Sequence, residues 1–478
     1  MLSLWNKKER GEAPLKKVRK EEFGNDLTQG SVAKKLILFS IPLIGAYLLQ
    51  SLYSMADMLI VSYLAGTYSM SGVNIVAQVA QVVTGVAFGF LSGTTVIVAQ
   101  YLGAGRKEDQ QKAVETSFAF IFWLSVLTTV SLLLLTDPLL KLLQTPEECY
   151  QEARNYYVIY MAGTIFVFFY NAISSVLRGL GDSKNPLYFV IISTALNICL
   201  DLIFVGPLKL GAAGAALATI IAQAISVVLA VIHLRRIGFG FDIKPKSFRI
   251  DREQLKLLFK LGTPVAVQET LLNVSLVVLV AAANALGVYE SAAVGIGSKI
   301  NVIFILPVCA LNVALATMVG QNIGAGKLDR AMQATNLEFW YSAIYSAVIC
   351  AVMWVFSKEL MMIFTDDPQT LAVGANYFKG HCWDYLLVMP FGYCFGGLFL
   401  GTGHSSYVAI ANGVGALVAR IPLCFILAHW LGLGVVGIGL AYPLSTCFTD
   451  FVYFYYYFKG DWKKSLLHSD RAEITKGM

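Results

Sequence analysis

The stretch VAQYLGAGRKED, from Val98 to Asp109, returns at an offset of 221 residues as VGQNIGAGKLDR, from Val319 to Arg330. Less similar repeated segments lie on both sides, at offsets between 221 and 223. They pair FSIP ending at Pro42 with LGTP ending at Pro264, LRGLGDS from Leu177 with LGTGHS from Leu400, and LKLGAAGAALA from Leu208 with LGLGVVGIGLA from Leu431. The duplication therefore runs through nearly the whole chain. A duplicated apolar chain of this size is typical of a transporter built from two half-bundles.

The composition indicates an integral membrane protein. The 478 residues are 57% hydrophobic and 14% charged, with a mean hydropathy of +0.65, and such a chain does not fold in water around a single core. The 8 cysteines are scattered singly without a CxxC pair, so neither a disulfide framework nor a zinc site is predicted. We expect no nucleic-acid partner, because the net charge of +6 has a membrane explanation.

Twelve segments are long enough to cross about 30 Å of hydrocarbon at roughly 20 residues each. We predict membrane helices at 36–64, 74–100, 113–136, 156–179, 186–206, 212–234, 256–286, 292–319, 332–357, 377–400, 406–430 and 434–458. An even number of spans in each half means that both copies enter the membrane in the same direction. The predicted fold is therefore an all-α integral membrane protein, with twelve transmembrane helices in two six-helix lobes related by a parallel internal repeat.

The lysines and arginines predict the orientation. With both termini inside, 29 of the 36 fall on the inner side, five on the outer side and two within spans, which is a strong positive-inside bias. The first 34 residues are charged and show no cleavable signal. We therefore expect a multi-pass protein of the cell inner (cytoplasmic) membrane. Its predicted parts are a cytosolic N-terminal tail (1–35), an N-lobe (36–234), a cytosolic linker (235–255), a C-lobe (256–459) and a cytosolic C-terminal tail (460–478).

Glycine and proline positions predict close packing and bending. Gly85, Gly89 and Gly93 form a four-residue ladder on the second span, a spacing that lets helices approach closely in lipid. Pro42 and Pro264 occupy equivalent positions in the first and seventh spans, where a proline removes a backbone hydrogen bond and can bend the helix.

Polar groups inside the first-half spans form the strongest candidate site. Asp57 lies on the first span, Asn197 and Asp201 lie one turn apart on the fifth, and Thr219 lies on the sixth. All four lie roughly 8–14 Å below the outer surface, at 1.5 Å per residue. Two carboxylates at one depth can hold a proton or exchange it for a cation, and the same oxygens suit Na⁺, a hard ion. The other interpretation is a polar cluster that only joins helices.

The second half carries a different set of charges. Glu269 lies on the seventh span, Lys299 on the eighth, Asp384 on the tenth and Arg420 on the eleventh. Opposite charges at similar depth favour internal salt bridges for the last three. Glu269 is deeper, about mid-span, where it could bind substrate or pair with Lys299. Apart from a possible Na⁺ at the first-half oxygens, no metal site is predicted.

These residues resemble the multidrug and toxic compound extrusion (MATE) family of bacterial drug/cation antiporters. The resemblance covers all twelve spans. It rests on the aspartate fifteen residues after Pro42, on QYLGAG and QNIGAG after spans two and eight, on LRGLGDSKNP from Leu177 to Pro186, and on LNICLD from Leu196 to Asp201. Each element is weak alone, but together, in order and doubled, they are specific.

The resemblance implies two six-helix lobes in a V that alternate between outward-open and inward-open states. It implies a coupling role for Asp57, a cation site shared with Asn197, Asp201 and Thr219, and a bend in the first helix marked by Pro42. The chain departs from the branch with a coupling glutamate eight residues after the span-seven proline, where it has Leu272. Glu269 does not match that position, which favours the first-lobe site.

The sequence thus predicts secondary active export of small lipophilic, often cationic, drug-like compounds in exchange for H⁺ or Na⁺. It predicts no cofactor beyond this coupling ion, contact with membrane lipid, and a monomer. The alternative is a lipid-linked precursor flippase of the same broader superfamily, although the acidic first-lobe groups argue against an anionic headgroup. An intramembrane enzyme would need a catalytic constellation, and no HExxH, GxSxG or clustered His/Cys set is present.

Overall fold

The computed structural model describes residues 26–237 and 248–463. This part of the chain folds into helices and turns without a β-strand. The first half contains α1 (Val32–Gly103), α2 (Lys107–Leu134), α3 (Thr136–Leu142), α4 (Glu147–Ala162), α5 (Thr164–Gly179), α6 (Lys184–Val205) and α7 (Gly211–Arg236). The second half contains α8 (Arg252–Leu286), α9 (Val288–Gly324), α10 (Leu328–Val355), α11 (Ser357–Met362), α12 (Pro368–Leu387), η2 (Val388–Tyr393), α13 (Cys394–Thr402), α14 (Ser405–Gly413), η3 (Val414–Arg420), α15 (Ile421–Phe425), η4 (Ile426–Trp430), α16 (Gly434–Lys459) and η5 (Asp461–Lys463).

The twelve predicted spans each have a helical counterpart. Within the described residues, ten helices are long and apolar enough to cross a membrane, and the pair α4–α5, which bends by 47°, adds another span. The 72-residue α1 is long enough for two crossings. Counting its two arms separately gives the predicted all-α architecture of two six-helix lobes.

Gly66 divides α1 into a first arm (32–65) and a second arm (67–103). Its backbone, with φ 84° and ψ −178°, is not helical, and a positive φ of this size favours glycine. The two ends of α1 both lie near Gln321, because the Leu27 amide donates to the Gln321 side chain at 3.0 Å and Gly103 packs against the Gln321 carbonyl. The arms are therefore antiparallel.

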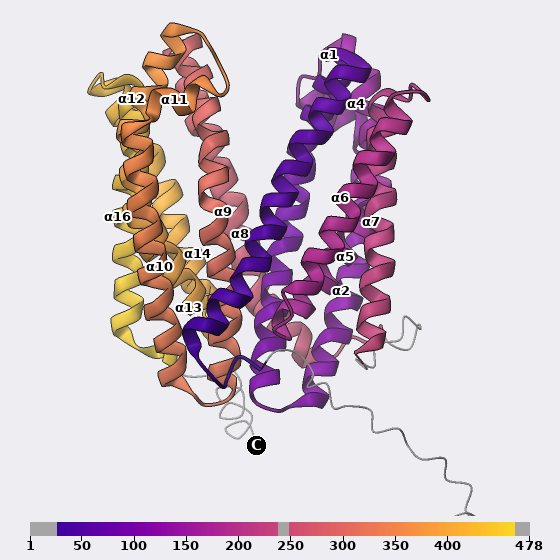
Figure 1. Cartoon of the computed structure of the whole chain (residues 1–478), viewed down its shortest axis with the longest axis vertical. Helices are drawn as coiled ribbons and strands as arrows, with labels where there is room; N and C mark the ends of the chain where they lie inside the picture. Colours follow the sequence, from indigo (N-terminus) through magenta and orange to yellow (C-terminus); the bar gives the residue numbers. More distant parts are fainter. Residues whose placement is uncertain (1–25, 238–247, 464–478) are drawn as a thin grey trace, which may run out of the picture.

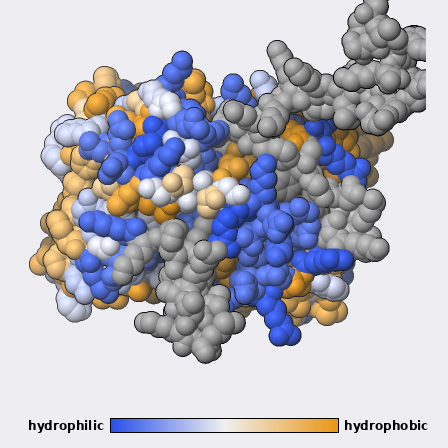
Figure 2. All heavy atoms as spheres, turned by 90° about the horizontal axis from the view of Figure 1, so that it is seen from below, coloured by the Kyte–Doolittle hydropathy of each residue, from blue (hydrophilic) through white to orange (hydrophobic). Residues whose placement is uncertain are grey.

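The two lobes form a V (Figure 1). They meet at the end where α1 and α9 finish, and they diverge toward the end that carries α11 and the start of α4. We call these the closed end and the open end. Figure 2 views the closed end and shows hydrophilic side chains gathered on it.

Two seams join the lobes, and the repeat relates them. The first arm of α1 packs on α9, where Leu36, Phe39 and Leu43 share a buried cluster with Ala314 and Met318. The second arm packs on α8 through the cluster of Phe90, Val96, Ile97, Tyr101, Leu257, Leu258 and Leu261. Because lipid is as apolar as these side chains, van der Waals packing rather than transfer out of water stabilises such seams inside a membrane.

The glycine ladder on the second arm has two different environments. A Cβ at Gly89 would overlap the Ala266 backbone, so this position needs glycine for the close packing. One at Gly93 would make a tight contact, 3.3 Å from Gly262 N. A Cβ at Gly85 would meet only the Glu269 Cβ, at 3.9 Å. The ladder therefore packs at its lower two positions and leaves space at the third.

Candidate ion-coupling site

The four polar residues of the first lobe lie together in its interior. The first arm of α1 carries Asp57, α6 carries Asn197 and Asp201, and α7 carries Thr219. Their exposed fractions are 8% for Asp57, 1% for Asn197, 0% for Asp201 and 6% for Thr219. The i, i+4 spacing on α6 places Asn197 and Asp201 on one helix face, and both side chains are buried within the lobe.

Hydrogen bonds link part of this cluster. The Asn197 amide donates to the Thr219 hydroxyl at 3.4 Å, and the Tyr53 and Thr219 hydroxyls are 2.8 Å apart. The Asp57 and Asp201 carboxyl groups are close enough to hydrogen-bond to each other when one carries a proton. Tyr53 was not predicted from the sequence, although its position one turn before Asp57 places it on the same helix face.

Four oxygens of the cluster lack a hydrogen-bond donor. They are Asp57 Oδ1, Asn197 Oδ1 and both carboxylate oxygens of Asp201. Buried polar groups normally have partners, and two ionised carboxylates cannot satisfy each other because both only accept. A proton shared by the pair, or a cation held by the surrounding oxygens, would supply what the cluster lacks.

The four charged residues predicted in the second lobe lie apart from this cluster. Glu269 on α8 faces a groove between the lobes, and Lys299 on α9 is exposed. Asp384 on α12 is buried and accepts a hydrogen bond from the Thr446 hydroxyl at 2.5 Å. Arg420 donates to the Ser445 hydroxyl at 3.2 Å, with its guanidinium 4.8 Å from the centre of the Tyr442 ring.

The salt bridges expected among Lys299, Asp384 and Arg420 are not formed in this conformation. Within the described residues, no nitrogen–oxygen pair of these side chains lies within ion-pairing distance. Hydroxyl groups and an aromatic ring on α16 take the place of opposite charges. Spacing along the sequence could not show this, because α16 contributes its hydroxyls from a distant part of the chain.

The second lobe also buries charges that sequence reasoning missed. Asp450 on α16 is 5% exposed, lies within electrostatic range of Asp384 and has one oxygen without a donor. Glu338 on α10 is fully buried, and its carboxylate accepts from the Ser342 hydroxyl at 2.9 Å. Both residues lie inside predicted spans, and this position could have identified them as candidate buried charges. Within the described residues, no group of three His, Cys, Asp or Glu side chains is arranged to hold a metal ion.

Two six-helix lobes that meet at one end, with buried carboxylates inside the bundles, are typical of a membrane transporter. A family model supports this class: MatE matches residues 42–203 and 264–426, once in each half. The chain belongs to the MatE family of multidrug efflux transporters.

Bacterial relatives match along nearly the whole chain. The probable multidrug resistance protein YpnP of Bacillus subtilis is 29% identical over 93% of this chain and 99% of its own length. The probable multidrug resistance protein NorM of Thermotoga maritima is 26% identical over 93% and 95%, and the multidrug export protein MepA of Staphylococcus haemolyticus is 24% identical over 85% and 90%.

Solved structures share the fold. A multidrug resistance MATE transporter described in an outward-facing conformation superimposes with a TM-score of 0.84 at 23% identity, covering 91% of this chain and 96% of that one. A MATE crystal structure described as straight gives the same score at 23% identity over 91% and 97%. At this identity the match defines the fold alone.

Proposed function

We propose that this protein is a secondary active exporter that exchanges H⁺ or Na⁺ for lipophilic, often cationic, compounds by alternating access of its two lobes. The observation that carries the proposal is the set of four donor-free oxygens around Asp57, Asn197 and Asp201. A cluster of buried acceptors without donors is costly inside a membrane protein, so binding of a proton or a small cation would lower its free energy.

The cluster joins three helices that belong to different parts of the lobe. The Thr219 side chain on α7 forms hydrogen bonds with Tyr53 on α1 and with Asn197 on α6. An ion that draws these oxygens together changes how the first arm of α1 sits against α6 and α7. Because the lower part of the same arm packs on α9 of the other lobe, ion binding can shift the balance between two arrangements of the lobes.

Pro42 supports this coupling. It lies inside the first arm and is buried beside the seam with α9. Since a proline cannot donate to the carbonyl four residues earlier, the helix lacks a backbone hydrogen bond at this point, fifteen residues from Asp57. We assign Pro42 the role of the bend that links the ion site to the seam.

The proposed topology has two lobes in the cytoplasmic membrane, with both termini in the cytosol. The division into an N-lobe at 36–234 and a C-lobe at 256–459 follows the internal repeat, with residues 238–247 of the linker outside the described residues. Placing the hydrophilic closed end (Figure 2) in the cytosol, as the basic residues favour, puts the protein in the cytoplasmic membrane with the V opening outward. The protein acts as a monomer in contact with membrane lipid.

Drug transport in proteoliposomes tests the proposal. Purified protein is reconstituted, and efflux of a fluorescent cation is measured under a Na⁺ gradient alone and a pH gradient alone. We expect one gradient to drive transport and Asp57→Asn to abolish it without loss of folded protein. Full transport by Asp57→Asn, with the gradient still required, would exclude the proposed ion site.

The flippase alternative is less compatible with the same site. A lipid-linked precursor carries an anionic headgroup, and the donor-free acceptors around Asp57 repel an anion. The relatives described as multidrug resistance or export proteins also favour drug-like compounds as the substrates.

A further inference from the structure

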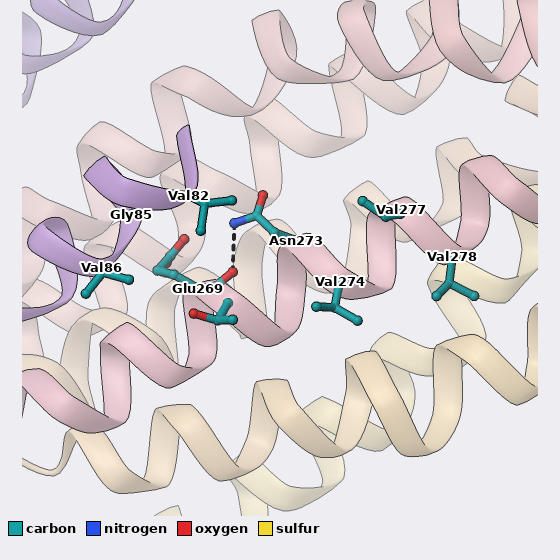
Figure 3. Close-up of a pocket in the computed structure, with 9 residues that line it drawn as sticks. Val82, Gly85, Val86, Glu269, Asn273, Val274, Val277 and Val278 are labelled. Atoms are coloured by element: carbon teal, nitrogen blue, oxygen red, sulfur yellow. Dashed lines mark hydrogen bonds between the residues drawn. The ribbon is translucent and has the colours of Figure 1, made fainter. Parts of the chain in front are cut away.

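A groove with a volume of about 280 Å³ lies between the lobes (Figure 3). Val82, Gly85 and Val86 form its α1 wall, and the turns of α8 from Glu269 to Val278 form the other. The volume is close to the lower limit of small-molecule sites. The groove can therefore hold a substantial part of a drug-sized compound.

The groove exists because two helices separate just above a close crossing. Gly89 and Gly93 let the second arm of α1 approach Ala266 and Gly262 on α8. One turn further toward the open end, Gly85 has no side chain to fill the widening space. The repeat offsets place Leu306 and Tyr47 at the positions equivalent to Gly85 and Glu269, so the other seam has bulky side chains where this one has space and a charge.

Among the described residues that line this groove, Glu269 alone carries a carboxylate. Within the described residues, its side chain forms neither a hydrogen bond nor an ion pair. The two polar neighbours are already occupied, since the Asn273 amide donates to the Glu269 backbone carbonyl at 2.8 Å and the Thr270 hydroxyl donates to the Ala266 carbonyl at 3.0 Å. What remains for a ligand is one half-buried negative charge between valine side chains.

These features fit one kind of ligand. An unpaired carboxylate beside apolar walls is costly. A ligand with a positive charge on an apolar body would neutralise the carboxylate with its charge and contact the walls with its apolar part. A neutral compound would leave the carboxylate unpaired, and an anion would be repelled. The groove is also separate from the Asp57 cluster, because it uses the other arm of α1 and a helix of the other lobe.

We propose that Glu269 selects the charge of the exported compound, by binding its cationic group in the groove between α1 and α8 while the valines contact its apolar part. This inference rests on the proposed function, which supplies the transport that Glu269 would select for. It separates two tasks: the first-lobe carboxylates bind the coupling ion, and Glu269 binds the substrate charge. Glu269 is thus a specificity-determining residue.

The test compares a cationic and a neutral dye. Efflux of ethidium, a monocation, and of Nile red, which is neutral, is measured for the wild type and for Glu269→Gln in proteoliposomes. We expect the apparent KM for ethidium to rise about ten- to a hundredfold, the range for losing a charge-assisted contact, while Nile red efflux is unchanged. An unchanged KM for ethidium would overturn the inference. The charge control is Glu290→Gln, on α9 and outside the groove, for which we expect wild-type kinetics with both dyes.

A steric pair tests the location. Gly85→Ala adds a methyl group that fits at 3.9 Å from the Glu269 Cβ, whereas Gly85→Leu fills the groove. We expect Gly85→Leu to reduce efflux of both dyes far more than Gly85→Ala. Equal efflux by these two variants would place the substrate elsewhere.

Direct binding separates this inference from the proposed function. Purified wild-type protein and Glu269→Gln are titrated with tetraphenylphosphonium without any ion gradient. Tight binding by the wild type that Glu269→Gln weakens supports the groove even if no gradient drives transport. Equal affinities in the two proteins would overturn the inference even if export is established.

Discussion

Gln100 on α1 donates a hydrogen bond from its side-chain amide to the backbone carbonyl of Gly401 on α13, 2.8 Å away in the other lobe. The repeat makes the same contact in reverse, because Gln321 on α9 donates to the Gly179 carbonyl at 3.1 Å. Both glutamines are 1% exposed. The duplicated QYLGAG and QNIGAG motifs thus form a reciprocal clasp that holds the lobes together at the closed end.

Removing one glutamine should loosen this clasp. Gln100→Ala deletes a hydrogen bond worth about 0.5–1.5 kcal/mol and leaves a buried carbonyl without its partner, so the population with separated lobes at the closed end should increase. Spin labels at Glu108 and Asp329, two exposed positions equivalent in the repeat, report the distance across this end. We expect a broader and longer distance distribution in Gln100→Ala, and a larger effect when Gln321→Ala is added.

The matched control is Gln110→Ala. The Gln110 side chain is also buried, but it donates at 3.2 Å to the Val98 carbonyl within its own lobe. A longer distance in this control as well would attribute the effect to general destabilisation rather than to the clasp.

Two glycines at the same crossing, Gly103 and Gly324, lie too close to the opposite helix to carry a side chain. A Cβ at Gly103 would overlap the Gln321 carbonyl, and one at Gly324 would overlap the Gln100 carbonyl. Gly103→Ala should therefore push the lobes apart or lower stability by about 1–3 kcal/mol, the usual cost of overpacking. Thermal unfolding in detergent and the same spin-label distance measure the two outcomes.

Gly295→Ala provides the reference for that experiment. Gly295 lies within α9, and a Cβ there meets nothing within 4 Å. Its methyl group should leave the melting temperature within a few degrees of the wild type. If Gly103→Ala behaves like Gly295→Ala, the crossing is more adaptable than the structure indicates.

The repeat and the hydropathy pattern predicted the twelve spans, but they did not predict how some spans connect. A break of several residues was expected between the first two spans, whereas α1 is helical on both sides of Gly66 alone. The fourth span was expected to begin at residue 156, whereas α4 begins at Glu147. Hydropathy detects the part of a helix in lipid, and polar turns that continue the helix beyond it give no signal.

The candidate sites show a similar limit. Matching depth brought Asp57, Asn197, Asp201 and Thr219 into one group, and the structure places them together. Lys299 and Arg420 also matched in depth, but Lys299 is exposed while Arg420 contacts Ser445 and Tyr442. Depth along a helix is readable from sequence, whereas the direction in which each side chain points depends on neighbours far along the chain.

Asp201→Asn tests the ion site through stability. Removing one of two buried carboxylates relieves an uncompensated charge, so we expect this variant to unfold at the same or a higher temperature than the wild type when no ion is bound. The wild type should gain about 2.7 kcal/mol at an ion concentration 100 times its Kd, and Asp201→Asn should lose that gain. Melting temperatures across a Na⁺ series and a pH series measure both effects.

The control for this series is Glu148→Gln, which removes an exposed charge at the start of α4. It should keep the full ion-dependent gain. A gain retained by Asp201→Asn would instead exclude this carboxylate from the ion site.

The segment before α1 gives a prediction about acidic pH. The Leu27 and Gly30 carbonyls accept from Arg330 at 3.3 and 2.8 Å, and Asp26 Oδ1 accepts from the Thr28 amide at 2.8 Å. Burial raises the pKa of Asp26, but hydrogen bonds from Thr28 and the positive charges of Lys35 and Lys327 outweigh burial and leave its pKa below the ordinary 3.8.

Because the folded pKa of Asp26 is lowered, its ionised form stabilises the docked segment above the unfolded pKa. This contribution disappears as the pH falls through the folded value. Hydrogen exchange of residues 26–31, corrected for intrinsic rates, should therefore be faster in Asp26→Asn than in the wild type at pH 7. The two proteins should converge below the folded pKa. Asp137→Asn, at the open end, should leave this segment unchanged at both pH values. If Asp26→Asn and the wild type already agree at pH 7, the Arg330 contacts hold the segment without the carboxylate.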